Sequence, residues 1–186
     1  MVLRKIARVS ARERLLIAAR SGGGQAMVDG ADKVSALVDC VRALDAAAVP
    51  YALIGGVAVG LHSRVPRATL DTDLAVRTSC RGPELIDALV VAGFERRGEF
   101  ARSVNLRHAS GEPLRLAFDA ELDAMIDRAE TFRIDGVDIR VVSKSDLIAM
   151  KRRAAADPSR RRSKALRDQA DIELLLGDVP EADEGW

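Results

Sequence analysis

The residues with the clearest chemistry lie in one stretch, "LIGGVAVGLHSRVPRATLDTDLAV", residues 53–76. A short apolar run ends in a glycine pair, Gly55 and Gly56, and residues 57–70 separate this pair from Asp71 and Asp73. Glycines at the end of a strand let the backbone come close to a ligand. At the start of a helix they also offer N–H groups to anionic oxygens. The pair is therefore a candidate phosphate cradle.

The two aspartates suit a metal ion. Side chains alternate along a strand, so Asp71 and Asp73 lie on the same face, about 7 Å apart by the strand rise. Mg²⁺ binds one or two carboxylates and keeps its other positions for water and substrate phosphates. A phosphate cradle beside a metal pair is the minimum equipment for in-line attack on a nucleotide α-phosphate. We therefore expect a site for a nucleoside triphosphate (NTP) and Mg²⁺.

Hydrophobic spacing and breakers predict the elements that position these residues. A strand at 51–56, a short helix, a loop at 65–70 and a strand at 71–76 make up the central stretch. Pro83 and Gly93 bound a later helix, and a Ser143 or Ser145 cap begins the helical C-terminal part, which Asp157-Pro158 interrupts. The remaining predicted segments are helices at 3–20, 32–48, 120–130, 145–156 and 163–176, and strands at 103–108, 114–119, 131–134 and 138–143.

This order predicts an α/β (α+β) fold, in which a small mixed β-sheet is flanked by helices and followed by a helical C-terminal part. We expect a helix and Gly-rich linker at 1–30, loosely attached because of "SGGGQ" at 21–25. One domain follows at 31–178, with a core at 31–142 and the helical part at 143–178. Residues 179–186 are expected to be a loose tail.

Composition narrows the class of protein. Hydrophobic residues make up 48% and charged residues 31% of the 186 residues, which is typical of a soluble globular domain. No apolar run approaches a membrane span, and Cys40 and Cys80 fit reduced thiols in a cytoplasmic protein. The net charge is +1. However, residues 151–167 hold eight basic residues and one acid, a segment that could meet phosphates.

The central stretch resembles the nucleotide-binding signature of the DNA polymerase β-like nucleotidyltransferase superfamily. More closely, "YALIGGVAVGLHSRVPRATLDTDLAV" is similar to the abortive-infection (AbiEii) toxin-type branch, which includes the MenT-like toxins. That branch has a later helical lysine and an Arg-Asp-x-x-Asp pattern near the C-terminus. "SKSDLIAMKRRAAADPSRRRSKALRDQADIELL" matches these with Lys151, Asp168 and Asp171. The resemblance covers roughly residues 35–176.

The resemblance implies roles for the residues of the front motif. Gly55 and Gly56 would hold the β- and γ-phosphates, and Asp71 and Asp73 would bind Mg²⁺. The superfamily often has a serine where Gly56 stands. It also commonly has a third metal-binding carboxylate on a neighbouring strand, for which Asp119 is the candidate. Asp119 could equally cap the helix that follows it.

For the rear motif, the resemblance implies that Lys151 neutralises phosphate charge. Asp168 or Asp171 would act on or orient the attacking hydroxyl. The alternative is that these aspartates make surface salt bridges with Lys164 and Arg167 one helical turn away. In the loop before Asp71, we assign Arg67 and Thr69 to nucleotide binding, Arg67 through a bidentate contact. An exposed loop arginine is the alternative for Arg67.

The function expected from these residues is Mg²⁺-dependent transfer of a nucleoside monophosphate (NMP) from an NTP to a hydroxyl. The resemblance suggests RNA, a tRNA 3′ end, as the acceptor and a toxin with a cognate antitoxin. The basic segment at 151–167 would contact the RNA backbone. Two alternatives stay open: a non-catalytic nucleotide- or RNA-binding module of the same fold, and an enzyme that modifies a small molecule such as an antibiotic.

Overall fold

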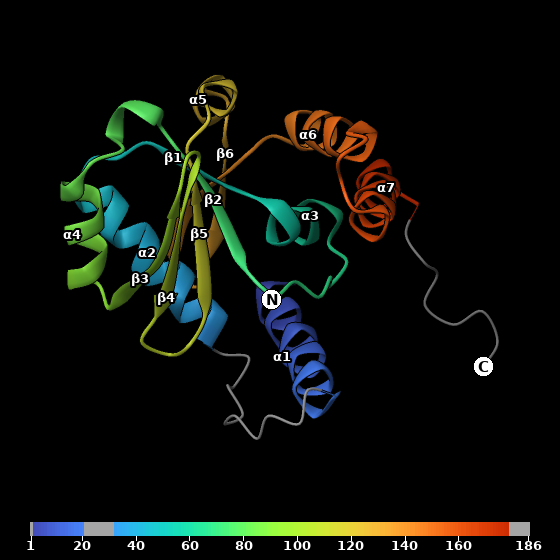
Figure 1. The fold of residues 1–186 in the computed structure, drawn as a ribbon, viewed down its shortest axis with the longest axis horizontal. Helices are drawn as coiled ribbons and strands as arrows, with labels where there is room; N and C mark the ends of the chain where they lie inside the picture. The colour runs from blue at the N-terminus through green and yellow to red at the C-terminus, as the bar shows by residue number, and fades with distance from the viewer. Residues whose placement is uncertain (1, 21–31, 179–186) are drawn as a thin grey trace.

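The structure, a computed structural model, describes residues 2–20 and 32–178. The predicted linker at 21–25 and the predicted tail at 179–186 lie outside the described residues. The described residues form seven α-helices and one seven-stranded sheet. Figure 1 shows helices on both sides of the sheet. None of the described helices has the length and apolar character needed to cross a membrane.

The sheet has the strand order β3-β4-β5-β2-β1-β7-β6. The β2–β5 and β1–β7 pairs are parallel, and the other neighbours are antiparallel. The predicted mixed α/β fold is therefore confirmed. The strands are β1 (Tyr51–Ile54), β2 (Thr72–Val76), β3 (Phe94–Phe100), β4 (Ser103–His108), β5 (Pro113–Ala117), β6 (Glu130–Ile134) and β7 (Val137–Val141).

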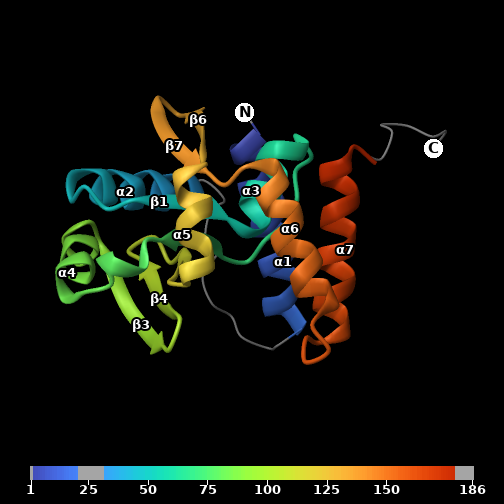
Figure 2. The same cartoon turned by 90° about the horizontal axis from the view of Figure 1, so that it is seen from above.

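The helices form layers on both sides of this sheet. In Figure 1, α2 and α4 cover one face, while α3, α6 and α7 lie on the other side, with α1 beneath α3. Figure 2 shows α5 between the sheet and α6. The helices are α1 (Val2–Arg20), α2 (Asp32–Ala46), α3 (Gly55–Ser63), α4 (Pro83–Val91), α5 (Ala120–Asp127), α6 (Lys144–Ala156) and α7 (Arg162–Leu176).

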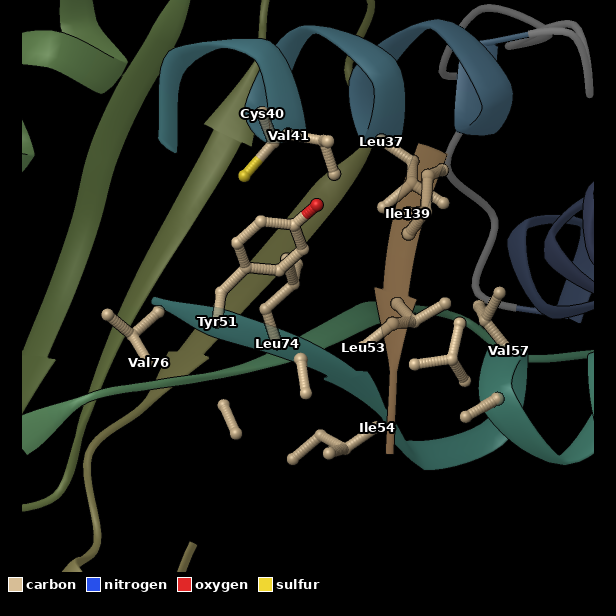
Figure 3. Close-up of a cluster of buried hydrophobic side chains, with 14 of the residues drawn as sticks. Leu37, Cys40, Val41, Tyr51, Leu53, Ile54, Val57, Leu74, Val76 and Ile139 are labelled. Carbon is tan, nitrogen blue, oxygen red and sulfur yellow. The ribbon is translucent and has the colours of Figure 1, made fainter. Parts of the chain in front are cut away.

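The core lies between α2 and the sheet. Leu37, Val41 and Leu44 recur at helical spacing along α2 and are fully buried. They pack over Leu53 of β1 and Leu74 of β2, as the close-up in Figure 3 shows for the labelled members of this cluster. β1 is buried along its whole length because helices cover both of its faces. The strand that leads directly into the glycine pair is thus fixed in the middle of the sheet.

The first half of α1 is packed against the domain, which differs from the expectation of a loosely attached element. Leu3, Ile6 and Ala7 are 2%, 0% and 2% exposed. Ile6 lies against Gly60 of α3, where even a methyl group would come within 2.5 Å of the Ile6 Cδ1 atom. The apolar positions of this helix face α3, so burial of its apolar side chains holds it to the domain.

β3 is a strand that the sequence analysis did not predict. Its sequence, "FERRGEF", buries only Phe94 on its first position and exposes most of the rest. β3 lies at the edge of the sheet, where charged side chains on both faces protect a strand from pairing with other chains. Such an edge strand lacks the alternation of apolar and polar residues on which the prediction depended. By contrast, the predicted Ser143 cap is confirmed, because its side chain accepts a hydrogen bond from Asp146 N.

Candidate active site

Gly55 places the backbone directly against the Asp73 carboxylate. It has φ +71, a left-handed conformation, and begins α3 where β1 ends. A Cβ at this position would lie 2.5 Å from Asp73 Oδ2. β1 and β2 are antiparallel neighbours with Ile54 opposite Asp73, which explains the approach. Only glycine meets both requirements at once, the positive φ and the absence of a side chain beside the carboxylate.

Gly56 makes room for the loop that leads into β2. A Cβ there would lie 2.3 Å from Arg67 Nη1 and 2.9 Å from Thr69 Oγ1. The guanidinium of Arg67 therefore occupies the space into which a serine side chain would project. Thr69 is fixed from the other side, because its N–H donates to the Ser10 hydroxyl of α1 at 3.0 Å. The predicted nucleotide-binding residues Gly56, Arg67 and Thr69 are thus brought together.

Asp73 lies in β2 with 18% of its side chain exposed, and the exposed Asp71 lies directly before the strand, which begins at Thr72 rather than at the predicted residue 71. Burial raises the pKa of Asp73 to about 6, and the charge of Asp71 adds to the rise. The positive charges of Arg115, Lys151 and Lys33 oppose it. Two close carboxylates, one of them largely desolvated, repel each other unless a cation lies between them.

The rear motif forms a buried network of charges. Asp168 and Asp171 of α7 are only 2% and 1% exposed. Lys151 of α6 places its ammonium 2.8 Å from Asp168 Oδ1 and 2.7 Å from Asp171 Oδ2. Arg160 donates to Asp168 Oδ2 at 2.6 Å. These aspartates are therefore not surface groups paired with Lys164 and Arg167 on their own helix.

Arg67 joins the front motif to this network. Its Nε donates to Asp171 Oδ1, and its Nη1 donates to Ala68 O at 3.1 Å. The side chain is 14% exposed, so the alternative of an exposed loop arginine does not hold. One continuous set of contacts thus runs from the Asp73 carboxylate through Gly55, Gly56 and Arg67 to Asp171 and on to Lys151 and Asp168.

Asp119 does not join this set, and its assignment as the third metal ligand is corrected. It is the N-cap of α5, where its side chain accepts from Glu121 N, and it pairs with Arg102 at 3.0 Å. In the parallel β2–β5 register, Arg115 lies opposite Asp73, whereas Asp119 follows the other end of β5. Among the described residues, no third carboxylate, imidazole or thiol completes a metal-binding cluster with the pair.

Three observations test whether the site fits Mg²⁺. Oδ1 of Asp73 is buried and accepts no hydrogen bond among the described residues, which leaves a lone pair available to a cation. The Arg115 Nη1 atom lies 3.8 Å from it, beyond hydrogen-bond distance. The donors of the pair are carboxylate oxygens, the ligands that Mg²⁺ prefers. The pair therefore fits a hard cation, with Asp71 and Asp73 as its protein ligands.

Sequence reasoning missed two basic residues beside this pair. Arg115 of β5 lies opposite Asp73 of the neighbouring strand β2, a relationship that depends on the strand register. Lys33 of α2 donates to Thr72 Oγ1 at 3.4 Å and pairs with Glu112, and both members of this pair are 1% exposed. A lysine on the buried face of the predicted helix at 32–48 was the available signal, because a buried lysine needs a partner.

The sequence matches no protein-family model and no curated protein. Solved structures do match. The antibiotic-resistance factor ANT(2″)-Ia superposes with a TM-score of 0.58, at 22% identity over 80% of this chain and 86% of that one. An antigenic nucleotidyltransferase-like protein from Paracoccidioides brasiliensis gives 0.56, at 22% identity over 81% and 79%. The chain has the nucleotidyltransferase fold.

The Megavirus polyadenylate synthase shows the same fold within a longer protein. It matches with a TM-score of 0.54 at 13% identity, over 92% of this chain but 38% of the viral one. These likenesses confirm the nucleotidyltransferase fold that the resemblance implied. Membership of the toxin-type branch stays a prediction.

Proposed function

We propose that the protein is a Mg²⁺-dependent nucleotidyltransferase that moves NMP from an NTP to a hydroxyl acceptor. The observation that carries this proposal is the close approach of the Gly55 backbone to the Asp73 carboxylate. It sets the start of α3, an anion-binding position, beside a pair of carboxylates that fits a hard cation. A metal-bound triphosphate requires these two features side by side.

The charge of each residue in the site decides whether it would bind the metal ion or the phosphates. Asp71 and Asp73 would hold Mg²⁺, which when bound neutralises phosphate charge and lowers the pKa of the acceptor hydroxyl. The N–H groups at Gly55 and Gly56 would bind the phosphates, with Thr69 beside them. Arg67 and Lys151, with Arg160, exceed the two buried aspartates by one positive charge, which would be available to the triphosphate.

In the proposed reaction the acceptor oxygen forms a bond to the α-phosphorus of the NTP. The bond between that phosphorus and the oxygen bridging to the β-phosphate breaks, and pyrophosphate leaves with its electron pair. The hydroxyl proton passes to solvent water. Stabilisation of the charge that develops on the equatorial and leaving oxygens is the main contribution of the protein.

Asp168 and Asp171 fit a positioning role better than direct contact with the attacking hydroxyl. Both are almost completely buried and already bound to cations, Asp168 to Lys151 and Arg160, and Asp171 to Lys151 and Arg67. Carboxylates held in this way fix the direction of the cations that they bind. They would hold Lys151 and Arg67 toward the triphosphate.

RNA, specifically a tRNA 3′ end, is the acceptor that we propose. Arg161, Arg162 and Arg167 of the basic segment at 151–167 are exposed and available to a phosphate backbone. Toxin activity and a cognate antitoxin are further parts of the proposal that depend on the resemblance to the toxin-type branch. An antitoxin would act by binding over the site or its acceptor surface.

A small-molecule acceptor is the second candidate, because three of the matched structures concern antibiotics or antibiotic resistance. One is the lincosamide adenylyltransferase LnuA with lincomycin bound, and another is ANT(2″)-Ia with adenylyl-2″-tobramycin. A cationic acceptor would need acidic groups at the rim of the site. The half-exposed Arg115 beside Asp73 has the opposite charge, so this candidate is the weaker for cationic compounds.

The test is incubation with each NTP labelled at the α-phosphate, Mg²⁺ and total tRNA, beside an Asp71→Ala, Asp73→Ala double variant. The proposal predicts label on RNA that the double variant fails to transfer. Label on the protein would replace RNA with a protein acceptor. If tobramycin or lincomycin becomes labelled and RNA does not, the second candidate is correct. Retained NTP binding without any transfer would indicate a non-catalytic module.

A further inference from the structure

A row of side chains leads across the sheet away from Asp73. The strand registers place Arg115 of β5 opposite Asp73, Asn105 of β4 opposite Arg115, and Gly98 of β3 opposite Asn105. Residues opposite one another in neighbouring strands point to the same face of the sheet. The row therefore starts at the metal pair and runs over three strand spacings, about 14 Å.

This face of the sheet is open where the row crosses it. Leu74, Leu106 and Leu114, which alternate with the row along β2, β4 and β5, are at most 1% exposed and face the core under α2 and α4. On the row itself, Arg115 has 50% of its side chain exposed. Figure 2 shows β3 and β4 at the end of the molecule away from α6 and α7, so these helices do not cover the far end of the row.

Phe100 lies at the far end of the row. Its side chain shares a face with Gly98 two residues earlier, and a Cβ at Gly98 would lie 3.2 Å from Phe100 Cε2. The ring is nevertheless 57% exposed, one of the few large apolar side chains on the described surface. It thus lies over a glycine at the end of the row and presents an aromatic surface to solvent.

The order of these groups matches the parts of a nucleotide chain. Arg115 can bind a phosphodiester, and a half-exposed guanidinium keeps donors available for it. Asn105 lies between Arg115 and Gly98 on this face and is partly exposed, so its amide group can form a hydrogen bond with the edge of a base. The exposed ring of Phe100 can stack on a base. Each of these contacts is made by unpaired nucleotides rather than by a duplex.

We propose that Arg115, Asn105 and Phe100 form the acceptor track of this enzyme, which binds the single-stranded 3′ end of an RNA across β5, β4 and β3. The terminal hydroxyl lies at Asp71 and Asp73, Arg115 binds the last phosphodiester, and Phe100 stacks on a base further toward the 5′ side. The inference rests on the proposed function and deepens it. It assigns acceptor binding to the open sheet face, separate from the basic segment at 151–167.

The experiment measures RNA binding without NTP, so that it does not depend on transfer. A 5′-fluorescein-labelled single-stranded RNA octamer is titrated with protein in Mg²⁺, and fluorescence anisotropy gives the Kd at several salt concentrations. Phe100→Ala and Arg115→Ala are compared with the wild type, and Phe100→Tyr keeps the ring. The matched controls are Val91→Ala on α4, 90% exposed, and Arg133→Ala on β6, at the opposite edge of the sheet.

Phe100→Ala is expected to raise the Kd at least about fivefold, because one base–aromatic stack is lost. Phe100→Tyr keeps the ring and is expected to bind RNA with the wild-type Kd. Arg115→Ala is expected to weaken binding. It should also reduce the slope of the logarithm of the association constant against the logarithm of the salt concentration by about 0.7, the value for one phosphate contact on a single strand. Both controls should bind as the wild type does.

Three results would overturn the inference. Wild-type affinity in Phe100→Ala and Arg115→Ala, with a loss on Arg161→Ala or Arg162→Ala, would place the RNA on the basic segment. Equal loss in Phe100→Ala and Phe100→Tyr would remove the stacking role. If the wild type binds no RNA, the track fails. The proposed function fails separately, when no acceptor receives label in the transfer assay.

Discussion

Arg67 donates a hydrogen bond to Asp171, 104 positions further along the chain, and this contact joins the loop before β2 to α7. Neither residue is part of the carboxylate pair. The contact nevertheless decides where the Arg67 guanidinium lies, directly beside Gly56. The helical C-terminal part therefore helps to build the nucleotide site, even though its own aspartates are buried away from solvent.

The Arg67–Asp171 contact predicts a large loss of stability on Asp171→Asn. Arg67 and Lys151 would both lose a negative partner in a nearly buried site, at a cost of about 3 kcal/mol in the free energy of unfolding. Urea denaturation measures this change. Asp138→Asn is the matched control, since Asp138 pairs with Arg133 while 59% of its side chain is exposed, and it should change stability by less than about 1 kcal/mol. Equal, small effects in the two variants would contradict the buried network.

Gly56→Ala should destabilise the protein because its methyl group would overlap Arg67 Nη1 and Thr69 Oγ1. Overpacking of this kind costs about 1–3 kcal/mol. In an Arg67→Ala background one of the two overlaps is gone, so the same substitution should cost less. Thermal unfolding of the wild type, the two single variants and the double variant gives the coupling free energy between positions 56 and 67. Purely additive effects would mean that Arg67 does not occupy this space in solution.

The raised pKa of Asp73 predicts a pH dependence of stability without divalent metal. The folded state holds the Asp73 proton up to a pH of about 6, whereas the unfolded chain loses it near 4. The protonated Asp73 therefore makes its full contribution to the free energy of unfolding below about pH 4. This contribution, about 3 kcal/mol, is lost as the pH rises through 6.

Urea denaturation in EDTA at pH 4 to 7 tests this dependence. Asp73→Asn lacks the titrating proton, so its stability relative to the wild type should increase from pH 4 to about pH 6 and change little from there to pH 7. Added Mg²⁺ should stabilise the wild type at pH 7 and leave Asp73→Asn largely unchanged, because binding to the folded state alone stabilises it. A stability difference independent of pH would show that Asp73 is not desolvated.

Thiol reactivity should distinguish the two cysteines. Cys40 is fully buried in α2, and burial raises the pKa of its thiol well above the usual range. Cys80 is only partly buried. A thiol-reactive dye at pH 8 should therefore label the folded protein once, at Cys80, and twice in denaturant. Rapid labelling of both in the folded protein would contradict the packing of α2 on the sheet.

The front half of the site could be predicted from the sequence because its geometry is local. Asp71 and Asp73 are one residue apart at the N-terminal end of β2, so the charge of one acts on the other, and a glycine pair between a strand and a helix allows a close approach. The mixed sheet and the helical C-terminal part followed from hydrophobic spacing. These inferences needed no knowledge of which distant segments touch.

The rest depends on packing between segments far apart in the sequence. Helical spacing puts Asp168 and Asp171 on one face, but it does not reveal that α6 supplies Lys151 to both. The register between β2 and β5 put Arg115, rather than Asp119, opposite Asp73. β3 was missed because its charges hide the alternation expected of a strand.

The central claim is that Asp71 and Asp73 carry metal-dependent transfer from an NTP. Its most direct test is the rate of pyrophosphate release with NTP, Mg²⁺ and total tRNA, for the wild type, Asp73→Asn and the surface control Arg133→Ala. We predict release by the wild type and the control, and a rate at least about 100-fold lower for Asp73→Asn, as expected for loss of charge stabilisation at the reacting phosphate. Release at the wild-type rate by Asp73→Asn would contradict the claim.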